Sequence, residues 1–317
     1  MPETRGLSGD DARRTLRNSG RWQLVRDAFV RLRVADGFSH GRSLAYTTSL
    51  VLVQAIIAVV GLAVALGTSS ASRVIVRTLK AAVPGPGGDL LTRTVTQAHQ
   101  AGATHRYAGL VFGLVGALIT GATTMGQLER GFNRIYGVER DRPTLQKYGL
   151  ATLLAVTAGF LVCMAFAALA LGQNIGDSLD NRAANSVWAL IRWPVGLLLI
   201  TGAITVILKV SPRRHQPELS WLAFGATVSG VLWVACTLAL GVFFTASKSF
   251  GQTYGPLAGI VALLLWALLS GLAVLFGCAV AAQLEAIRSG RSEPQDEAKI
   301  EHSEPNQPRE RVRASAG

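Results

Sequence analysis

Apolar residues in this chain of 317 residues gather in long blocks, and the charged residues lie between the blocks. Six blocks each reach the roughly 20 residues that a helix needs to cross a bilayer. A helix is required there because lipid cannot satisfy open backbone polar groups. The blocks cover residues 43–67, 107–127, 148–171, 187–210, 221–246 and 256–284. The pattern predicts an all-α, polytopic membrane protein whose six transmembrane helices form a domain over residues 43–286.

The segments that flank this domain have a different composition. Residues 1–20 are polar and rich in arginine, which predicts a disordered basic N-terminus. In residues 21–42, apolar side chains recur at helical spacing among arginines, namely Trp22, Val25, Phe29 and Leu32. This spacing predicts an amphipathic helix at the membrane interface, and a helix packed on a cytoplasmic loop is the alternative. Residues 287–317 combine prolines with mixed charges and predict a disordered cytoplasmic tail.

The connection between the first two blocks, residues 68–106, is longer than the others. Apolar residues such as Leu79, Leu90 and Val95 are set among basic residues there, and the run from Pro84 to Gly88 interrupts them. We expect short amphipathic helices on the outer face of the membrane domain, hinged at this break.

Charge supports the same interpretation. The net charge is +12, which in a soluble protein would favour nucleic acid as a partner, but only 16% of the residues are charged and 50% are hydrophobic. Most cations flank apolar blocks, so we expect membrane lipids with anionic head groups as partners, and no nucleic acid. Of the 31 Lys and Arg, 23 lie in segments that six spans place on one side. The positive-inside rule then predicts a bacterial inner-membrane protein with both termini in the cytoplasm.

The sequence shows no pattern of an enzyme. It lacks a GxxxxGK[ST] phosphate loop, an HExxH zinc motif and a GxSxG nucleophile elbow. The five histidines are scattered outside the spans, and the three cysteines lie inside apolar blocks without a CxxC spacing. We therefore predict no enzyme, no catalytic residue, no cofactor and no metal site.

Three stretches resemble the YihY/virulence factor BrkB family of bacterial inner-membrane proteins, some of which were once labelled as ribonucleases. They are Ser43–Tyr46, Gly131–Gly137, and Tyr254–Gly259 with the later Gln283–Glu285. The family-like motif residues are Tyr46, Asn133, Tyr136, Gly137 and Glu285. The resemblance covers about residues 21–288 and implies a six-helix membrane fold with a loosely defined role in envelope integrity or export.

Polar residues inside the blocks are the candidates for a translocation path. These are Gln54, Thr124, Gln127 and Arg192. A buried arginine suits an anionic group, and a glutamine at the middle of a span supplies a polar centre. The alternatives are an arginine that reaches the outer interface and a glutamine that forms an interhelical hydrogen bond.

A segment at the start of the last block is a candidate outer gate. It contains Gln252, Tyr254, Gly255 and Pro256, and its glycines also recur at the spacing of close helix packing. Glu129 and Glu285 end two spans near Arg130, Arg134 and Arg288, so surface ion pairs are expected, with proton coupling as the alternative.

These observations together favour translocation or export of an amphipathic or anionic envelope component. The alternative is a non-transporting membrane scaffold that binds partners through the outer loop or the basic cytoplasmic face. The sequence leaves the oligomeric state open, a homo-oligomer included.

Overall fold

The computed structural model describes residues 6–290 except 19, 67–74, 77, 81, 105–106, 139–141, 179–181 and 248. Within helices it does not describe the side chains of residues 18, 102–104, 166–178, 182–193 and 256. The described part is all helical and contains no strand. Its longer helices are α1 (Gly9–Asn18), α2 (Arg21–Val34), α3 (Gly37–Ala65), α5 (Pro86–Thr104), α6 (Ala108–Tyr136), α7 (Thr144–Ser178), α8 (Arg182–Val210), α9 (Leu219–Ala246) and α11 (Ala258–Arg288). The short helix α10 (Phe250–Tyr254) and the 3₁₀ turn η1 (Gly255–Leu257) join α9 to α11.

Five of the described helices are long and apolar enough to cross a membrane. They are α3, α6, the first part of α7 over Thr144–Ala165, α9 and α11. In α8, the described side chains of Pro194–Val210 form a shorter apolar stretch. The all-α, multi-pass architecture is therefore confirmed, whereas the count of six spans stays a prediction.

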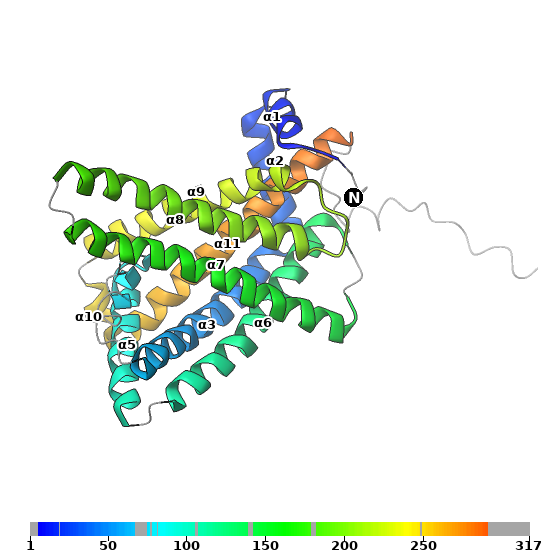
Figure 1. The fold of residues 1–317 in the computed structure, drawn as a ribbon. Helices are drawn as coiled ribbons and strands as arrows, with labels where there is room; N and C mark the ends of the chain where they lie inside the picture. The colour runs from blue at the N-terminus through cyan, green and yellow to red at the C-terminus, as the bar shows by residue number, and fades with distance from the viewer. Residues whose placement is uncertain are drawn as a thin grey trace, which may run out of the picture.

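Helix α11 lies at the centre of the bundle and packs against α9, α3, α2 and α5. Helices α3 and α6 form a second extensively packed pair, and α7 lies on α8 (Figure 1). Small residues allow these close approaches. A Cβ atom added at Gly61 would come 2.5 Å from the backbone nitrogen of Leu110, and one at Gly225 would come 2.6 Å from the carbonyl oxygen of Gly277.

The two ends of the bundle differ in which elements they contain. Helices α1 and α2 lie at the same end as the last turns of α11, and α5 and α10 lie at the opposite end (Figure 1). An ion pair between Arg288 and Asp11 and a hydrogen bond from Arg31 to Gln283 join the first helices to the last one. The two ends of the described chain therefore share one face of the bundle, as an even number of spans requires.

The predicted disorder of residues 1–20 is wrong for residues 9–18, which form α1. Ala12 and Thr15 are buried, and the helix packs against α9 and the end of α11. The backbone N–H of Gly9 donates to Ser220 Oγ (3.0 Å), and the N–H of Glu218 donates to the carbonyl of Leu7 (3.2 Å). A short polar helix without an apolar block gives no membrane signal, so only its tertiary contacts reveal that it is ordered.

Helix boundaries also differ from the apolar blocks. Helix α3 begins at Gly37 instead of residue 43, because the chain turns at Asp36, which has φ 53°. Helix α6 continues past residue 127 to Tyr136, since its polar second half is buried by other elements. In the connection between α3 and α6, which was predicted to be an outer one, α5 starts after Gly85 (φ 66°) and buries Leu91 and Val95. The part of that connection before the Pro/Gly break lies largely outside the described residues.

Candidate functional site

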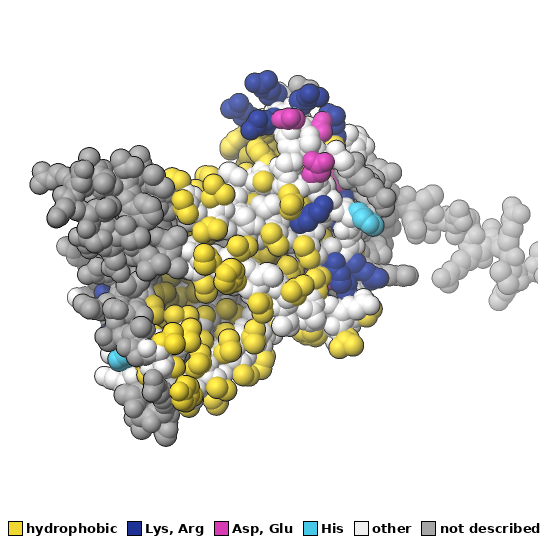
Figure 2. Space-filling view, in the orientation of Figure 1, with side chains coloured by type: hydrophobic (Ala, Val, Ile, Leu, Met, Phe, Trp, Pro, Cys, Tyr) yellow, Lys and Arg dark blue, Asp and Glu magenta, His cyan; other side chains and the backbone are white. Residues whose placement is uncertain are grey.

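The basic end of the bundle contains the densest polar network among the described residues. We use this name for α1, α2, the connections between α6 and α7 and between α8 and α9, and the last turns of α11. Figure 2 shows Lys and Arg side chains gathered over this end, next to an apolar surface along the helices. Two buried carboxylates, from Glu129 and Glu285, lie under it and are 2% and 0% exposed.

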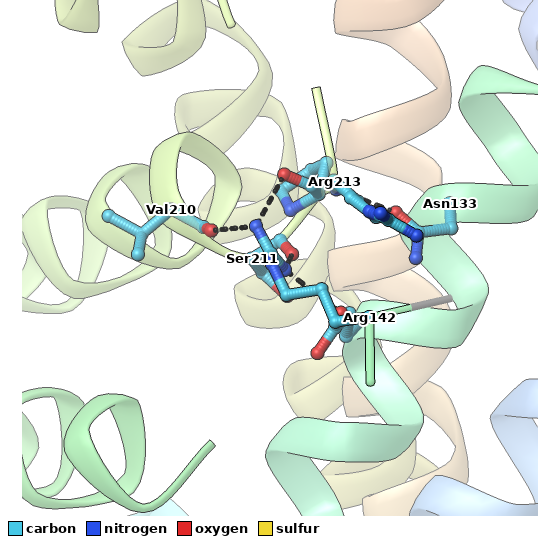
Figure 3. A network of polar contacts seen from close by, with 7 residues as sticks. Asn133, Arg142, Val210, Ser211 and Arg213 are labelled. Carbon is cyan, nitrogen blue, oxygen red and sulfur yellow. Dashed lines mark hydrogen bonds and ion pairs between the residues drawn. The ribbon is translucent and has the colours of Figure 1, made fainter. Parts of the chain in front are cut away.

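Arg142 links three elements at this end. Its Nη1 forms an ion pair with Glu129 Oε1 at 2.8 Å and also donates to the carbonyl oxygen of Ser211 at 2.6 Å. Its Nη2 donates to the carbonyl oxygens of Pro212 at 3.1 Å and of Val210 at 3.4 Å, and Figure 3 shows Arg142 beside Val210 and Ser211. The last carbonyls of a helix lack partners within the helix and carry partial negative charge. Arg142 therefore caps the C-terminus of α8 while it neutralises a buried carboxylate of α6.

Asn133 fastens the same connection to α6. It is 1% exposed, and its Oδ1 accepts a hydrogen bond from the backbone N–H of Arg213 at 2.9 Å (Figure 3). Four residues later, Gly137 caps the end of α6 with φ 68°, and the N–H of Val138 donates back to the carbonyl of Asn133. A left-handed residue at this position favours glycine, because any Cβ atom there is strained.

Glu285 of α11 is paired with Arg214, whose side chain is itself almost completely buried. The guanidinium of Arg214 also lies 4.6 Å from the centre of the Tyr136 ring, which is a cation–π contact. Two residues earlier in α11, Gln283 Oε1 accepts a hydrogen bond from Arg31 Nε at 2.8 Å. Burial lowers the pKa of the Arg31 guanidinium, and the neighbouring Tyr136 opposes this shift.

The structure therefore brings four of the five family-like residues together. Asn133, Tyr136 and Gly137 come from α6 and Glu285 from α11, and all four surround the connection between α8 and α9. Tyr46 lies elsewhere, on α3, with 63% of its surface exposed. The sequence could group the first three by adjacency, but not with Glu285.

The expectation of surface ion pairs for the two glutamates is wrong, because both carboxylates are buried. Glu129 pairs with Arg142 and Glu285 pairs with Arg214, and both carboxylates are buried rather than on the surface. Arg288 pairs instead with Asp11 of α1. These contacts form because connections fold back over the helix ends, so neighbours in sequence are poor guides to them. In the sequence, the arginines of the short connection after α8, Arg213 and Arg214, were the feature that could have indicated a partner for Glu285.

The candidate path residues lie at separate places along α3 and α6. A Cβ atom added at Gly116 of α6 would come 2.6 Å from Gln54 Oε1, so Gln54 packs directly on the backbone of α6. Thr124 is buried and donates to the carbonyl of Thr120 in its own helix (2.8 Å), and Gln127 is partly buried. At about 1.5 Å per residue, Gln127 lies roughly 16 Å along α6 from Gly116. The side chain of Arg192 lies outside the described residues.

The candidate outer gate is held by aromatic contacts. Gln252 and Tyr254 are exposed in α10, and Gly255 begins η1 with φ 50°. The ring centre of Tyr254 lies 4.7 Å from that of Phe250, and Phe250 contacts Phe244 at 5.2 Å. The side chain of Pro256 lies outside the described residues. Helix α10 is thus fixed to the end of α9 by ring contacts.

An open groove of about 540 Å³ lies beside this aromatic cluster, and we call it the outer groove. Its lining consists of Pro84, Thr237, Leu238, Gly241, Val242, Thr245 and Ala246. The volume falls in the range of small-molecule sites, about 300–1,000 Å³. Next to Pro84, a Cβ atom on Gly85 would come 2.6 Å from the ring of Phe244, so the glycine lets the outer connection approach α9.

Long apolar helices around a short, charged end define this protein as a multi-pass α-helical membrane protein. The family model described as Virulence factor BrkB matches residues 28–301, and the chain belongs to this family. Among the residues that the structure describes, no three His, Cys, Asp or Glu side chains are placed to hold a metal ion.

Several bacterial proteins are similar to this chain over part of their length. The ribonuclease-like protein YfkH of Bacillus subtilis is 25% identical over 179 residues, which is 55% of this chain and 65% of that protein. A UPF0761 membrane protein of Aromatoleum aromaticum is 27% identical over 264 residues, 81% of this chain and 63% of its own. One from Xanthomonas oryzae is 26% identical over 185 residues, 56% and 41% of the two chains. The matches thus span less than two thirds of these relatives. No solved structure matches.

Proposed function

We propose that this chain is a six-span protein of the bacterial inner membrane, with both termini in the cytoplasm. We further propose that it translocates or exports an amphipathic or anionic envelope component. The outer groove is the observation that carries this proposal. It lies in the second half of α9, a helix suited to crossing the membrane, and Leu238 and Val242 in its lining are 66% and 70% exposed.

The chemistry of the groove suits the apolar part of an amphipathic molecule. Its two hydroxyl groups already have partners, because Thr245 donates to the carbonyl of Gly241 and Thr237 accepts from the indole of Trp266. The side-chain hydroxyl groups of the lining therefore each have a hydrogen-bond partner in the groove wall, which lowers the cost of covering them with an apolar chain. The exposed α10 segment beside the groove provides polar groups at the level of the head group, including Gln252.

A non-transporting scaffold is the second candidate, and the position of Gln54 favours it. Gln54 packs against Gly116 in the interface between α3 and α6, which is what an interhelical contact requires. The buried network at the basic end would then serve to hold a fixed surface for partners. The two candidates differ in one measurable property, which is movement of an amphiphile across the bilayer.

Purified protein in phospholipid vesicles tests the proposal with a fluorescent anionic lipid and an impermeant quencher. We expect the protein to accelerate exchange between leaflets. Gly241→Trp should fill the outer groove and slow this exchange about tenfold, a loss of roughly 1.4 kcal/mol of barrier lowering. Val231→Trp is the matched control, because Val231 is an exposed residue of α9 that does not line the groove. Exchange no faster than in empty vesicles would favour the scaffold.

The proposed polar path has its own test in the same vesicles. Arg192→Leu should impair transfer of an anionic lipid severely, and Arg192→Lys should impair it partly, because lysine keeps the charge but loses the bidentate geometry. Gln54→Leu should also slow transfer if it lies on the path. Normal transfer by all three variants would remove these residues from the proposed mechanism.

Cysteines at two exposed positions test the proposed orientation. Gln252→Cys lies in α10, at the end of the bundle opposite the basic end, which we call the outer end. Arg13→Cys lies in α1 at the basic end. An impermeant thiol reagent added to intact cells should label the first and not the second, and permeabilised cells should show both. If only Arg13→Cys were labelled in intact cells, the proposed orientation would be wrong and the basic end would face outward.

A further inference from the structure

Helix α2 presents an aromatic face away from the bundle. The side of the helix next to this face is packed, with Leu24, Ala28 and Leu32 all buried. Trp22 is 82% exposed and Phe29 is 47% exposed. These two residues are seven apart, so they lie on one side of the helix, two turns from each other. The face thus exposes large apolar rings although the helix already has a packed side.

Arginines accompany the aromatic residues on this face. Arg26 follows Trp22 by four residues and Arg33 follows Phe29 by four, so each arginine neighbours a ring on the helix surface. Both arginines are exposed. Large aromatic residues beside cations are the pattern of a helix that lies in the head-group region of an anionic membrane.

The aromatic face continues into a membrane-spanning helix. The ring of Phe29 contacts that of Phe38 on the first turn of α3, with the ring centres 6.0 Å apart. Phe38 is 44% exposed, and α3 is one of the helices suited to crossing the membrane. The exposed apolar surface of α2 therefore joins a surface that lipid covers, which identifies lipid as the occupant rather than a separate protein.

We infer that the face formed by Trp22, Val25 and Phe29 of α2 and Phe38 of α3, together with Arg26 and Arg33, inserts among anionic lipid head groups. Contacts with α11 hold the helix, because Leu24, Ala28 and Leu32 are buried and Arg31 bonds to Gln283. The helix would thus fix the depth of the basic end in the membrane. This inference is independent of any transport activity and of which leaflet the face meets.

Environment-sensitive probes on single cysteines test the inference in the full chain, with Cys163 and Cys236 replaced by alanine and the buried Cys278 retained. Trp22→Cys and Phe29→Cys report the aromatic face. Gln23→Cys is the matched control, because Gln23 is exposed but points to another side of α2. The protein is placed in vesicles of phosphatidylcholine, alone or mixed with phosphatidylglycerol, and an acyl-chain quencher is added.

In the mixed vesicles, the probes at positions 22 and 29 should be quenched by the lipid-borne quencher several-fold more than the probe at 23. Arg26→Gln with Arg33→Gln should abolish the difference between mixed vesicles and pure phosphatidylcholine. Equal quenching at all three positions would overturn the inference. Weak quenching at positions 22 and 29 that becomes strong when the protein is diluted in lipid would also overturn the inference. Such a result would mean that a second copy of the protein covers the face at high protein density.

Discussion

The basic end and the outer end of this bundle are held together by different interactions. At the basic end, buried ion pairs and charge-assisted hydrogen bonds tie the connection after α8 to α6 and α11, through Arg142 and Arg214. At the outer end, α10 is attached to α9 by ring contacts, such as Phe250 with Phe244. Removal of one partner from a buried charge pair lowers the stability of the fold by about 3–5 kcal/mol. Each aromatic contact contributes only about 0.5–1.5 kcal/mol to that stability.

This contrast indicates which end can move. An element that is held by a few apolar contacts opens at low cost, and such elements are where conformational change occurs. The outer groove lies at this weaker end, beside Gly85 and the aromatic cluster. The basic end instead resembles a fixed base on which the helices are anchored. The predictions below test this difference in order of expected effect.

The largest effect should come from breaking the buried pair of Glu285 and Arg214. Arg214→Met leaves a carboxylate that is 0% exposed beside an apolar side chain. We expect a loss of about 3–5 kcal/mol in the free energy of unfolding, measured by denaturant titration in detergent. The double variant with Glu285→Leu should recover most of this loss.

Arg288→Ala is the control for that experiment. Arg288 pairs with Asp11, and its side chain is 45% exposed, so the loss should be at most about 1 kcal/mol. Equal losses in the free energy of unfolding for Arg214→Met and Arg288→Ala would mean that the buried ion pair stabilises the basic end no more than an exposed one does.

A smaller loss should follow from separating α9 and α11 near the basic end. A Cβ atom at Gly277 would collide with Ser229 and with the carbonyl oxygen of Gly225, so Gly277→Ala should cost about 1–3 kcal/mol. Gly202→Ala in α8 is the matched control, because nothing lies within 4 Å of its added Cβ. The control should be neutral or slightly stabilising through helix propensity. A neutral result for Gly277→Ala would show that the helices are less closely packed.

Removing the central ring of the outer cluster should produce a local effect. Phe250→Ala deletes contacts with Phe243, Phe244 and Tyr254. We expect faster amide exchange in α10 by a few fold, equivalent to about 1 kcal/mol, without a change in exchange at the end of α11. Leu257→Ala, at a 59% exposed position nearby, should leave exchange in α10 unchanged. If amide exchange became faster both in α10 and at the end of α11, the two ends of the bundle would not open independently of each other.

The smallest effect concerns the docking of α1 and depends on pH. The backbone N–H and hydroxyl of Ser8 both donate to Asp11, and these bonds lower the pKa of the Asp11 carboxyl. A carboxyl whose pKa is lower in the folded state stabilises that state above the ordinary pKa of aspartate, and this contribution is lost as the pH falls through the folded value. The protection factor of the α1 amides, which is the intrinsic exchange rate at each pH divided by the observed rate, should therefore fall in acid. Asp11→Asn should remove the pH dependence, and an unchanged profile would exclude Asp11 as its cause.

Much of the fold was predictable because lipid imposes a strong constraint. A run of apolar residues such as 221–246 must form a helix to satisfy its backbone in a membrane, and α9 covers Leu219–Ala246. After the Pro/Gly break the chain forms α5, which begins at Pro86, where the sequence pattern predicted an amphipathic segment. In contrast, α1 was not predictable, because a helix of ten residues depends on its contacts with α9 and α11 for stability.

The candidate site was only partly predictable. The motif that contains Asn133, Tyr136 and Gly137 stood out in the sequence, and these residues lie within one helix end. The partners Arg142 and Arg214 did not stand out, because each comes from a connection between helices. A sequence shows which residues are adjacent along a helix, but loop geometry determines which charges meet after folding.

The sequence by itself determined that this protein is helical and embedded in a membrane, since hydrophobic length and backbone hydrogen bonding leave no other structure for its apolar blocks. It also determined that basic residues gather on one side. Only the tertiary structure decided that Glu129 and Glu285 are buried with Arg142 and Arg214, and that α2 exposes Trp22 and Phe29 while Leu24 packs inward. The physical reason is that burial and charge pairing depend on how separate helices cross, whereas the membrane signal depends only on residues that are consecutive in the chain.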